Sequence, residues 1–144
     1  MTVVRFDTKI AIVLATGLEP WQELNVTAFL SSGIVAVPDP VLGKPYRDGS
    51  GNDYLPMFRQ PVLVFSATAE QLRTVHGKAL ERGLELAIYT RELFGTGNDE
   101  DNRAEVIDVP AEKLDLVGIA LYGPRNAVDR TVKGIDLHGR ARLG

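Results

Sequence analysis

Four short apolar runs place the strongest constraint on how this chain of 144 residues can fold. They span residues 10–15, 61–65, 84–89 and 116–122. Continuous apolar runs of this length, bounded by turn-forming residues, are typical of strands that are buried on both faces of a sheet. The sequence therefore predicts four strands in one sheet, with no room for a second domain of similar size.

Three segments between or after these runs carry helix signals. They span about residues 20–37, 68–82 and 125–133. Pro20 stands where a helix accepts proline, at the first helical position. Thr68 and Gln71 have the spacing of a capping box, and Gly83 is a stop signal. Helices alternating with buried strands predict a single α/β domain over residues 1–144, with a mostly parallel or mixed sheet.

The first predicted helix is apolar over most of its circumference. Its apolar residues are Leu24, Val26, Ala28, Phe29, Leu30, Ile34 and Val35. A helix cannot turn all of these toward one sheet, so we expect it to be covered on its other side by a loop layer or a partner subunit. We expect this partner subunit to be a second copy of the chain, so that the protein is a homodimer.

Residues 38–60 interrupt the alternation and are predicted to form a loop or hairpin insertion. Prolines surround a turn-forming run at residues 48–53, and Tyr46 and Tyr54 flank that run. This pattern favours a small exposed hairpin. Long loops in compact domains are often functional.

Composition excludes several classes of protein and site. There is no cysteine, which excludes disulfides, zinc–thiolate sites and thiol nucleophiles. The net charge of −3 argues against a generally basic nucleic-acid binder. Residues 1–8 do not resemble a signal peptide, and no stretch approaches the roughly 18 apolar residues of a membrane span. We expect a cytoplasmic protein with no membrane partner and no cofactor.

The turn after the first strand and the start of the first helix hold two candidate ligand-binding residues, Trp21 and Asn25. Open α/β sheets bind ligands where a helix begins at the carboxyl end of a strand. The turn lacks the glycine spacing of a phosphate loop, and Glu19 would repel an anion. Asn25 has two interpretations, a structural bridge to backbone or an amide that orients a ligand.

The loop after the third strand offers further candidates. Its acidic run, residues 98–102, lacks the glycine and terminal glutamate of a calcium loop and is predicted to be a solvated loop ending in a helical turn. Arg91, Glu92 or Arg103 would reach a cleft from this region. Neither His76 nor His138 has a serine elbow or an acid at metal spacing nearby in the sequence. We therefore expect no catalytic triad and no metal site, with both histidines exposed.

The end of the chain is locally basic. Its cations are Arg125, Arg130, Lys133, Arg140 and Arg142, against Asp129 and Asp136. Such a patch contacts nucleic-acid phosphates or an anionic ligand, or is only a solvated face. We regard nucleic acid as the weaker alternative to a small-molecule ligand.

Residues 116–124, LVGIALYGP, followed by a short helix and KGIDL, resemble the closing strand and helix of type 2 peptidyl-tRNA hydrolases. The blocks KIAIV (9–13), WQELNVTA (21–28) and RQPV (59–62) are similar to those of DUF2000, a family of uncharacterised bacterial proteins in that superfamily. The resemblance implies a peptidyl-tRNA hydrolase II-like fold, a three-layer α/β/α sandwich with a four-stranded mixed sheet.

The catalytic residues of those hydrolases do not carry over. Where they open the first helix with a lysine- and glycine-rich stretch, this chain has LEPWQE (18–23). Where they have an aspartate followed by Ala-Gly after the third strand, it has TRELF (90–94). Near this position, only Glu92 and Thr96 are chemically similar to the residues of the hydrolase motif. Losing the lysine weakens phosphate binding.

The sequence thus predicts a non-hydrolytic cytosolic protein that binds a small ligand or partner in a cleft beside the first helix. The candidate ligand-binding residues are Trp21, Asn25, Arg91, Tyr122 and Arg125. The alternative is a hydrolase of an ester or amide, such as a peptidyl-tRNA-like substrate. In it Glu92 would act as the base, and Arg91 or Arg125 would steer an anion.

Overall fold

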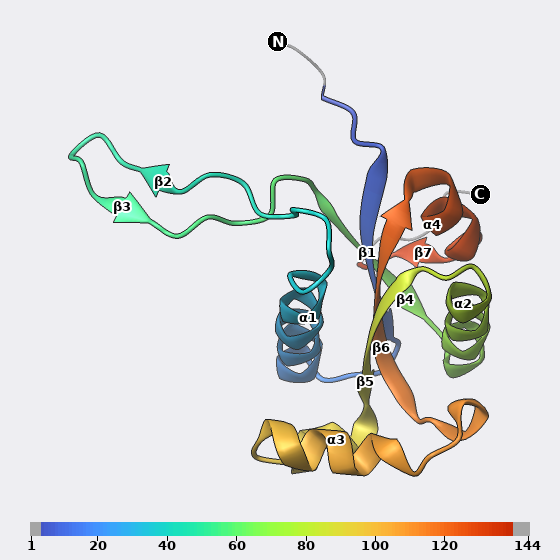
Figure 1. Ribbon diagram of the computed structural model, residues 1–144. Helices are drawn as coiled ribbons and strands as arrows, with labels where there is room; N and C mark the ends of the chain where they lie inside the picture. Colours follow the sequence, from blue (N-terminus) through green and yellow to red (C-terminus); the bar gives the residue numbers. More distant parts are fainter. Residues whose placement is uncertain (1–3, 140–144) are drawn as a thin grey trace.

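The computed structural model of the chain describes residues 4–139, which form a mixed sheet with helices on both sides (Figure 1). The main sheet contains β1 (Thr8–Ala15), β4 (Val62–Ala67), β5 (Glu85–Thr90), β6 (Leu116–Pro124) and β7 (Asp136–Leu137). The helices are α1 (Pro20–Ile34), α2 (Ala69–Glu81), α3 (Asp99–Ile107) and α4 (Arg125–Thr131), with short 3-10 turns η1 (Arg91–Gly95) and η2 (Ala111–Lys113). The predicted mixed α/β class is confirmed.

The sheet has five strands in the order β5-β6-β1-β4-β7, so the prediction of four was wrong. β1 and β4 run parallel, and the other neighbouring pairs are antiparallel. The additional strand, β7, contributes only two residues, paired as Phe65 with Leu137 and Ser66 with Asp136. A strand this short has no periodicity that could reveal it in the sequence.

The core lies on the two central strands, β1 and β6. Residues 10–14 of β1 and 116–122 of β6 are buried throughout, as expected of strands that are covered on both faces. Figure 1 shows α1 on one side of the sheet and α2 and α4 on the other. Val26, Leu30 and Ile34 form the buried stripe of α1 at four-residue spacing. Leu24 of the same helix remains 73% exposed.

Helix α1 packs so closely on the sheet that the contact requires two glycines, Gly33 on the helix and Gly118 on the sheet. A Cβ atom on Gly118 of β6 would lie 2.4 Å from Val26 Cγ1, and one on Gly33 would lie 2.9 Å from Ala87 Cβ. Both distances are too short for a real side-chain contact. Gly118 and Gly33 therefore fix how near α1 lies to β6 and β5.

The capping residues behave as the sequence predicted. Pro20 opens α1, and the Thr68 hydroxyl accepts a hydrogen bond from the backbone N–H of Gln71 at the start of α2. Gly83 follows α2 with a φ of +66°, which suits glycine. Helix α1 ends at Ile34, three residues before the expected end.

The predicted hairpin is present in residues 38–60. Strands β2 (Tyr46–Arg47) and β3 (Asp53–Tyr54) pair with Tyr46 opposite Tyr54, and together they form an arm that projects away from the body of the molecule (Figure 1). Arg47 and Asp53 form a bidentate ion pair across it. The arm places several apolar side chains in solvent, among them Leu55, which is 85% exposed.

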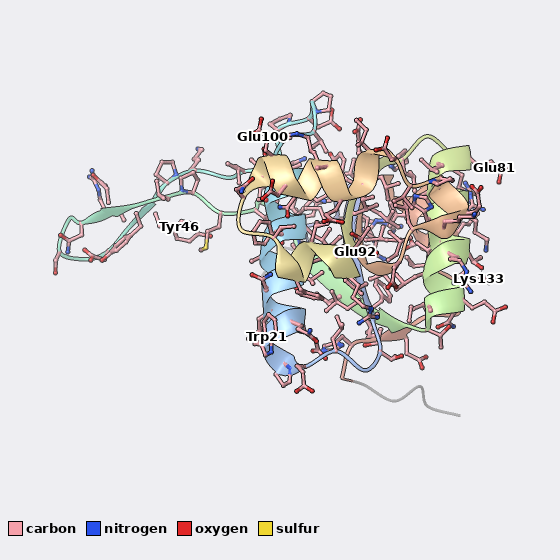
Figure 2. All side chains as sticks on the ribbon, turned by 90° about the horizontal axis from the view of Figure 1, so that it is seen from below. Trp21, Tyr46, Glu81, Glu92, Glu100 and Lys133 are labelled. Carbon is pink, nitrogen blue, oxygen red and sulfur yellow. The ribbon has the colours of Figure 1, made fainter. Side chains whose placement is uncertain are left out.

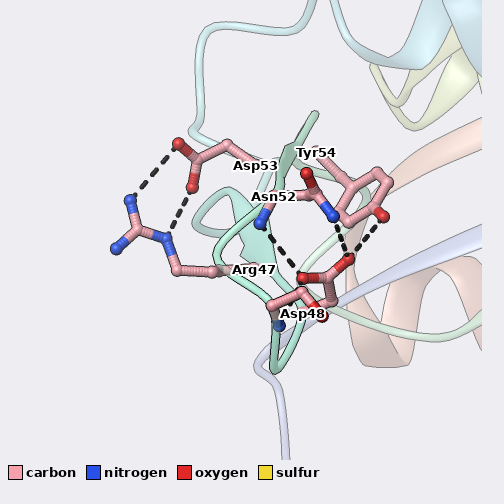
Figure 3. A network of polar contacts seen from close by, with 6 residues as sticks. Arg47, Asp48, Asn52, Asp53 and Tyr54 are labelled. Atoms are coloured by element: carbon pink, nitrogen blue, oxygen red, sulfur yellow. Dashed lines mark hydrogen bonds and ion pairs between the residues drawn. The ribbon is translucent and has the colours of Figure 1, made fainter.

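Asp48 organises the tip of this arm (Figure 3). Its carboxylate accepts hydrogen bonds from the side chain and backbone of Asn52, the Tyr54 hydroxyl and the Ser50 backbone N–H. These donors, first the Asn52 side chain, hold the pKa of Asp48 well below its ordinary value. The hydrogen bond from the Tyr54 hydroxyl to Asp48 also raises the pKa of Tyr54.

Two local predictions were wrong. The acidic run 98–102 is not a loop, because the Asn98 side chain caps the Asp101 backbone N–H and α3 begins at Asp99. Acidic residues in a first helical turn are favoured by the helix dipole. His76 is buried on α2 rather than exposed, and this burial lowers its pKa.

Two residues of the predicted basic patch, Arg140 and Arg142, lie outside the described residues. Within residues 4–139, no helix has the length and apolarity needed to cross a bilayer.

Replacing Gly118 with alanine is expected to lower the free energy of unfolding by about 1–3 kcal/mol, because the added methyl group overpacks the α1 interface. Chemical denaturation measures the change. The matched control is Gly77→Ala in α2, where a Cβ would meet open space and alanine favours the helix by up to about 1 kcal/mol. Equal stability of wild type and the Gly118 variant would contradict the close packing.

Candidate functional site

A cleft lies between α1, β5, η1 and α3 and consists of two adjoining cavities of about 450 and 400 Å³. The cavities share part of their lining, including Phe29, Tyr89 and Asn102. Both volumes are in the range of small-molecule sites, roughly 300–1,000 Å³. The sequence predicted a cleft beside the first helix, and the structure has a cavity there.

The larger cavity is apolar. Its own lining residues include Leu30, Gly33, Ala87, Ile88, Val106 and Ile107. They come from α1, β5 and α3, so the close approach of Gly33 to Ala87 forms part of the wall. Ile107 is exposed at the end of α3. This half of the cleft suits an aliphatic or aromatic group without charge.

The smaller cavity is bordered by four aromatic rings that contact one another in series. Trp21 meets Phe94 with centroids 5.6 Å apart, Phe94 meets Tyr89 at 5.1 Å, and Tyr89 meets Phe29 at 5.8 Å. Trp21 projects from the start of α1 (Figure 2). The first and last of these contacts are edge-to-face and the middle one is tilted, and aromatic pairs favour such arrangements over face-to-face stacking. The four rings together form an aromatic wall of the cleft.

Amide and hydroxyl groups stand beside these rings. Asn25 Nδ2 donates a hydrogen bond to the Tyr89 hydroxyl at 3.1 Å, and the Thr96 hydroxyl donates to Asn102 Oδ1. Asn25 thus bridges to a side chain of the cleft, not to backbone. Burial raises the pKa of Tyr89, and the hydrogen bond from Asn25 only partly offsets this effect. The hydroxyl is therefore protonated at neutral pH and keeps its own hydrogen to donate.

The other predicted residues lie away from the cleft. Arg91 is on η1, but its guanidinium pairs with Asp115 (Nε to Oδ2, 3.2 Å). Glu92, also on η1 (Figure 2), is exposed and does not line either cavity. Tyr122, near the opposite end of β6, bonds to Asp39, and Arg125, the first residue of α4, bonds to the Phe6 carbonyl oxygen. Of the five ligand candidates, the structure brings only Trp21 and Asn25 together.

Several cleft residues were not singled out in the sequence. Tyr89 was taken as a core strand residue, and Asn102 as part of a solvated loop. Phe94 follows the same strand, and Thr96, noted in the sequence only for its similarity to the hydrolase motif, comes two residues later. The available signal was the unusually polar segment directly after β5, which turned out to carry one wall of the cleft. Arg103, considered in the sequence, does line it and forms an ion pair with Asp99.

His138 is exposed, as the sequence predicted, and its side chain has two partners. Its imidazole lies between two side chains: Ser66 Oγ is 2.5 Å from Nδ1, and Glu23 Oε2 is 2.7 Å from Nε2. Ser66 is on β4, His138 directly follows β7, and Glu23 is on α1. These partners are 72 and 115 positions away from His138 in the chain, so no local spacing in the sequence indicates the contact. Within residues 4–139, no three side chains of His, Asp or Glu are grouped to hold a metal ion.

Comparison with known proteins adds a family but no activity. The family model described as "Protein of unknown function (DUF2000)" matches residues 8–139. A solved structure of Atu0240, a protein of unknown function from Agrobacterium tumefaciens strain C58, is 45% identical to this chain with a TM-score of 0.90. The match covers 94% of this chain and all of that one. No functionally curated protein matches.

Substituting Asn25 with leucine is expected to raise the pKa of Tyr89 further, because the lost donor stabilised the phenolate form. A titration of the tyrosine ring carbons by NMR measures the change. Asn126→Leu on the exposed side of α4 serves as the control and should leave the titration of Tyr89 unchanged. An unchanged pKa in the Asn25 variant would show that the Asn25–Tyr89 contact does not persist in solution.

Proposed function

This chain belongs to DUF2000, a family of unknown function, and we propose a function from its own geometry: the cleft between α1 and α3 binds a small, flat, uncharged molecule. The observation that carries the proposal is the series of four aromatic rings beside the Asn25–Tyr89 and Thr96–Asn102 pairs. A concave apolar site with a few converging polar groups is the usual form of a ligand site.

The two halves of the cleft divide the ligand between them. A planar ring would lie against the aromatic wall of the smaller cavity, where Trp21 and Phe94 offer faces and edges. An acceptor atom on that ring would receive the hydrogen of the Tyr89 hydroxyl, which is itself oriented by Asn25. A substituent without charge would extend into the apolar cavity beside Val106.

The charges around the cleft support a neutral ligand over an anion. Among the described lining residues Arg103 is the only cation, and it is paired with Asp99. Arg91 is held by Asp115, and Arg125 lies at the other end of β6. A phosphate would gain no unpaired cation here. The cleft is therefore a weaker candidate for nucleic acid than for a small heterocycle.

Binding without hydrolysis fits this cleft best. Glu92, the proposed base of the hydrolase alternative, does not line it. We also propose that the protein is cytosolic and is related to type 2 peptidyl-tRNA hydrolases. The kinship is supported by Gly123 and Pro124, which end β6 immediately before α4 as the resemblance implies.

A second copy of the chain is the partner that we propose for the exposed apolar side chains. They form two groups on one molecule: Tyr46, Tyr54, Leu55 and Met57 on the arm, and Trp21, Leu24, Phe29 and Val35 on α1 and its C-cap. Clusters of this kind mark interaction sites. In a two-fold symmetric dimer each group on one copy can meet the other group on its partner.

The ligand proposal is tested with a panel of uncharged heteroaromatic compounds, including adenine, uracil, nicotinamide and indole. We expect at least one to raise the melting temperature and to quench the single tryptophan, Trp21. In Asn25→Leu its affinity should fall by roughly 2- to 10-fold, the loss of one hydrogen bond, whereas Asn126→Leu should bind like wild type. Binding of phosphorylated compounds only, with a steep salt dependence, would contradict the proposal.

The dimer proposal predicts a mass of two chains at micromolar concentration by light scattering. Leu55→Glu should shift the protein to one chain, because a charge would enter the apolar contact. Leu80→Glu is the control, since Leu80 is 55% exposed on α2, on the other face of the sheet. A single-chain mass for the wild type would reject the dimer.

A further inference from the structure

Ser66, His138 and Glu23 form a connected set of side chains on the far side of α1 from the cleft. Glu23 reaches toward β7, whereas Asn25, two positions along the helix, reaches toward β5. Ser66 is the penultimate residue of β4, and its register partner in the parallel strand β1 is Leu14. The set therefore lies at the carboxyl ends of two parallel strands, where α/β sheets commonly place their sites.

The geometry is that of a nucleophile, a base and a carboxylate in series. The Glu23 carboxylate, 2.7 Å from Nε2, fixes the neutral imidazole with its proton on that nitrogen. Nδ1 is then the unprotonated acceptor that faces the Ser66 hydroxyl at 2.5 Å. A hydroxyl within hydrogen-bond reach of a base that is itself oriented by a third group is the general pattern of an activated nucleophile. The two ring nitrogens are exchanged relative to the usual serine triad.

The position of His138 does not require these contacts for its own anchoring. Its backbone N–H donates to the Val64 carbonyl oxygen at 2.8 Å, and Leu137 pairs with Phe65. The main chain thus already holds the end of β7 on β4. The side chains of His138 and Glu23 remain 37% and 27% exposed, so solvent and a substrate can reach the set. A buried structural link would be closed to both.

We propose that Ser66, His138 and Glu23 are an esterase site that hydrolyses neutral or cationic carboxylic esters. The Glu23 carboxylate, 2.7 Å from Nε2 of His138, places a negative charge beside the base of this set. It disfavours the approach of an anionic ester. The site is separate from the aromatic cleft and does not depend on a ligand bound there.

The reaction proceeds in two balanced halves. Ser66 Oγ attacks the ester carbonyl carbon while Nδ1 of His138 takes its proton, and the ester C–O bond then breaks as Nδ1 returns the proton to the leaving alcohol. Water attacks the acyl-serine, gives one proton to Nδ1, and the carboxylic acid leaves as Ser66 regains that proton. Ester and water become acid and alcohol. Glu23 stabilises the imidazolium that forms in each half.

The test uses the full chain with a fluorophosphonate, which labels activated serines, and with p-nitrophenyl acetate. Intact mass and peptide mapping should show one label per chain, on Ser66. Ser66→Ala and His138→Gln should abolish labelling and reduce ester hydrolysis to the buffer rate. Ser32→Ala on the exposed side of α1 and His76→Gln on α2 are the matched controls and should keep both.

Glu23 is a positioning residue, and its role is tested separately by the kcat and KM of its variants. Glu23→Gln should lower kcat by about 10²- to 10⁴-fold with little change in KM, because the imidazole loses its fixed proton position. Glu23→Asp should recover part of kcat. Asn126→Leu, on the exposed side of α4, belongs to neither site and should leave ester hydrolysis unchanged. Absence of label on Ser66 in folded wild-type protein, or equal hydrolysis by wild type and Ser66→Ala, would overturn the proposal.

Discussion

The close contact of α1 with the sheet is the constraint on which the other features depend. The helix can lie directly on β6 only because Gly118 has no side chain, and directly on β5 only because Gly33 meets Ala87. The buried stripe of Val26, Leu30 and Ile34 then fixes the rotation of the helix about its axis. With distance and rotation set, the two flanks of α1 acquire defined neighbours on either side of the buried stripe.

Each flank contributes to a different site. On one flank Asn25 reaches the Tyr89 hydroxyl of β5, and Trp21 contacts Phe94 of η1. On the other, Glu23 reaches His138 at the end of β7. A small shift of α1 would disturb both sets of contacts, since both are set by the same packing. Glu23 and Asn25 are only two positions apart in the chain, but they belong to different sites because their side chains point in different directions from α1.

Much of the fold could be predicted from local signals. The four long strands of the sheet, the capping of α2 by Thr68 and the hairpin around residues 48–53 all depend on patterns within a few residues. Trp21 and Asn25 were also found this way, because a helix start after a buried strand is a recurrent ligand position. Strand β7 has only two residues, which is too short to show a hydrophobic period in the sequence. Helix α3, residues 99–107, is too polar for the hydrophobic pattern to distinguish it from a loop.

The sequence by itself determined the class of the fold, the exposed arm and the position of one wall of the cleft. These features follow from hydrophobic period, turn chemistry and caps, which act between near neighbours. Only the tertiary structure decided that Tyr89 meets Asn25, that Arg91 and Arg125 face other partners, and that His138 lies between Ser66 and Glu23. Such contacts join residues tens of positions apart, and strand order and helix rotation fix them through the packing of the whole core.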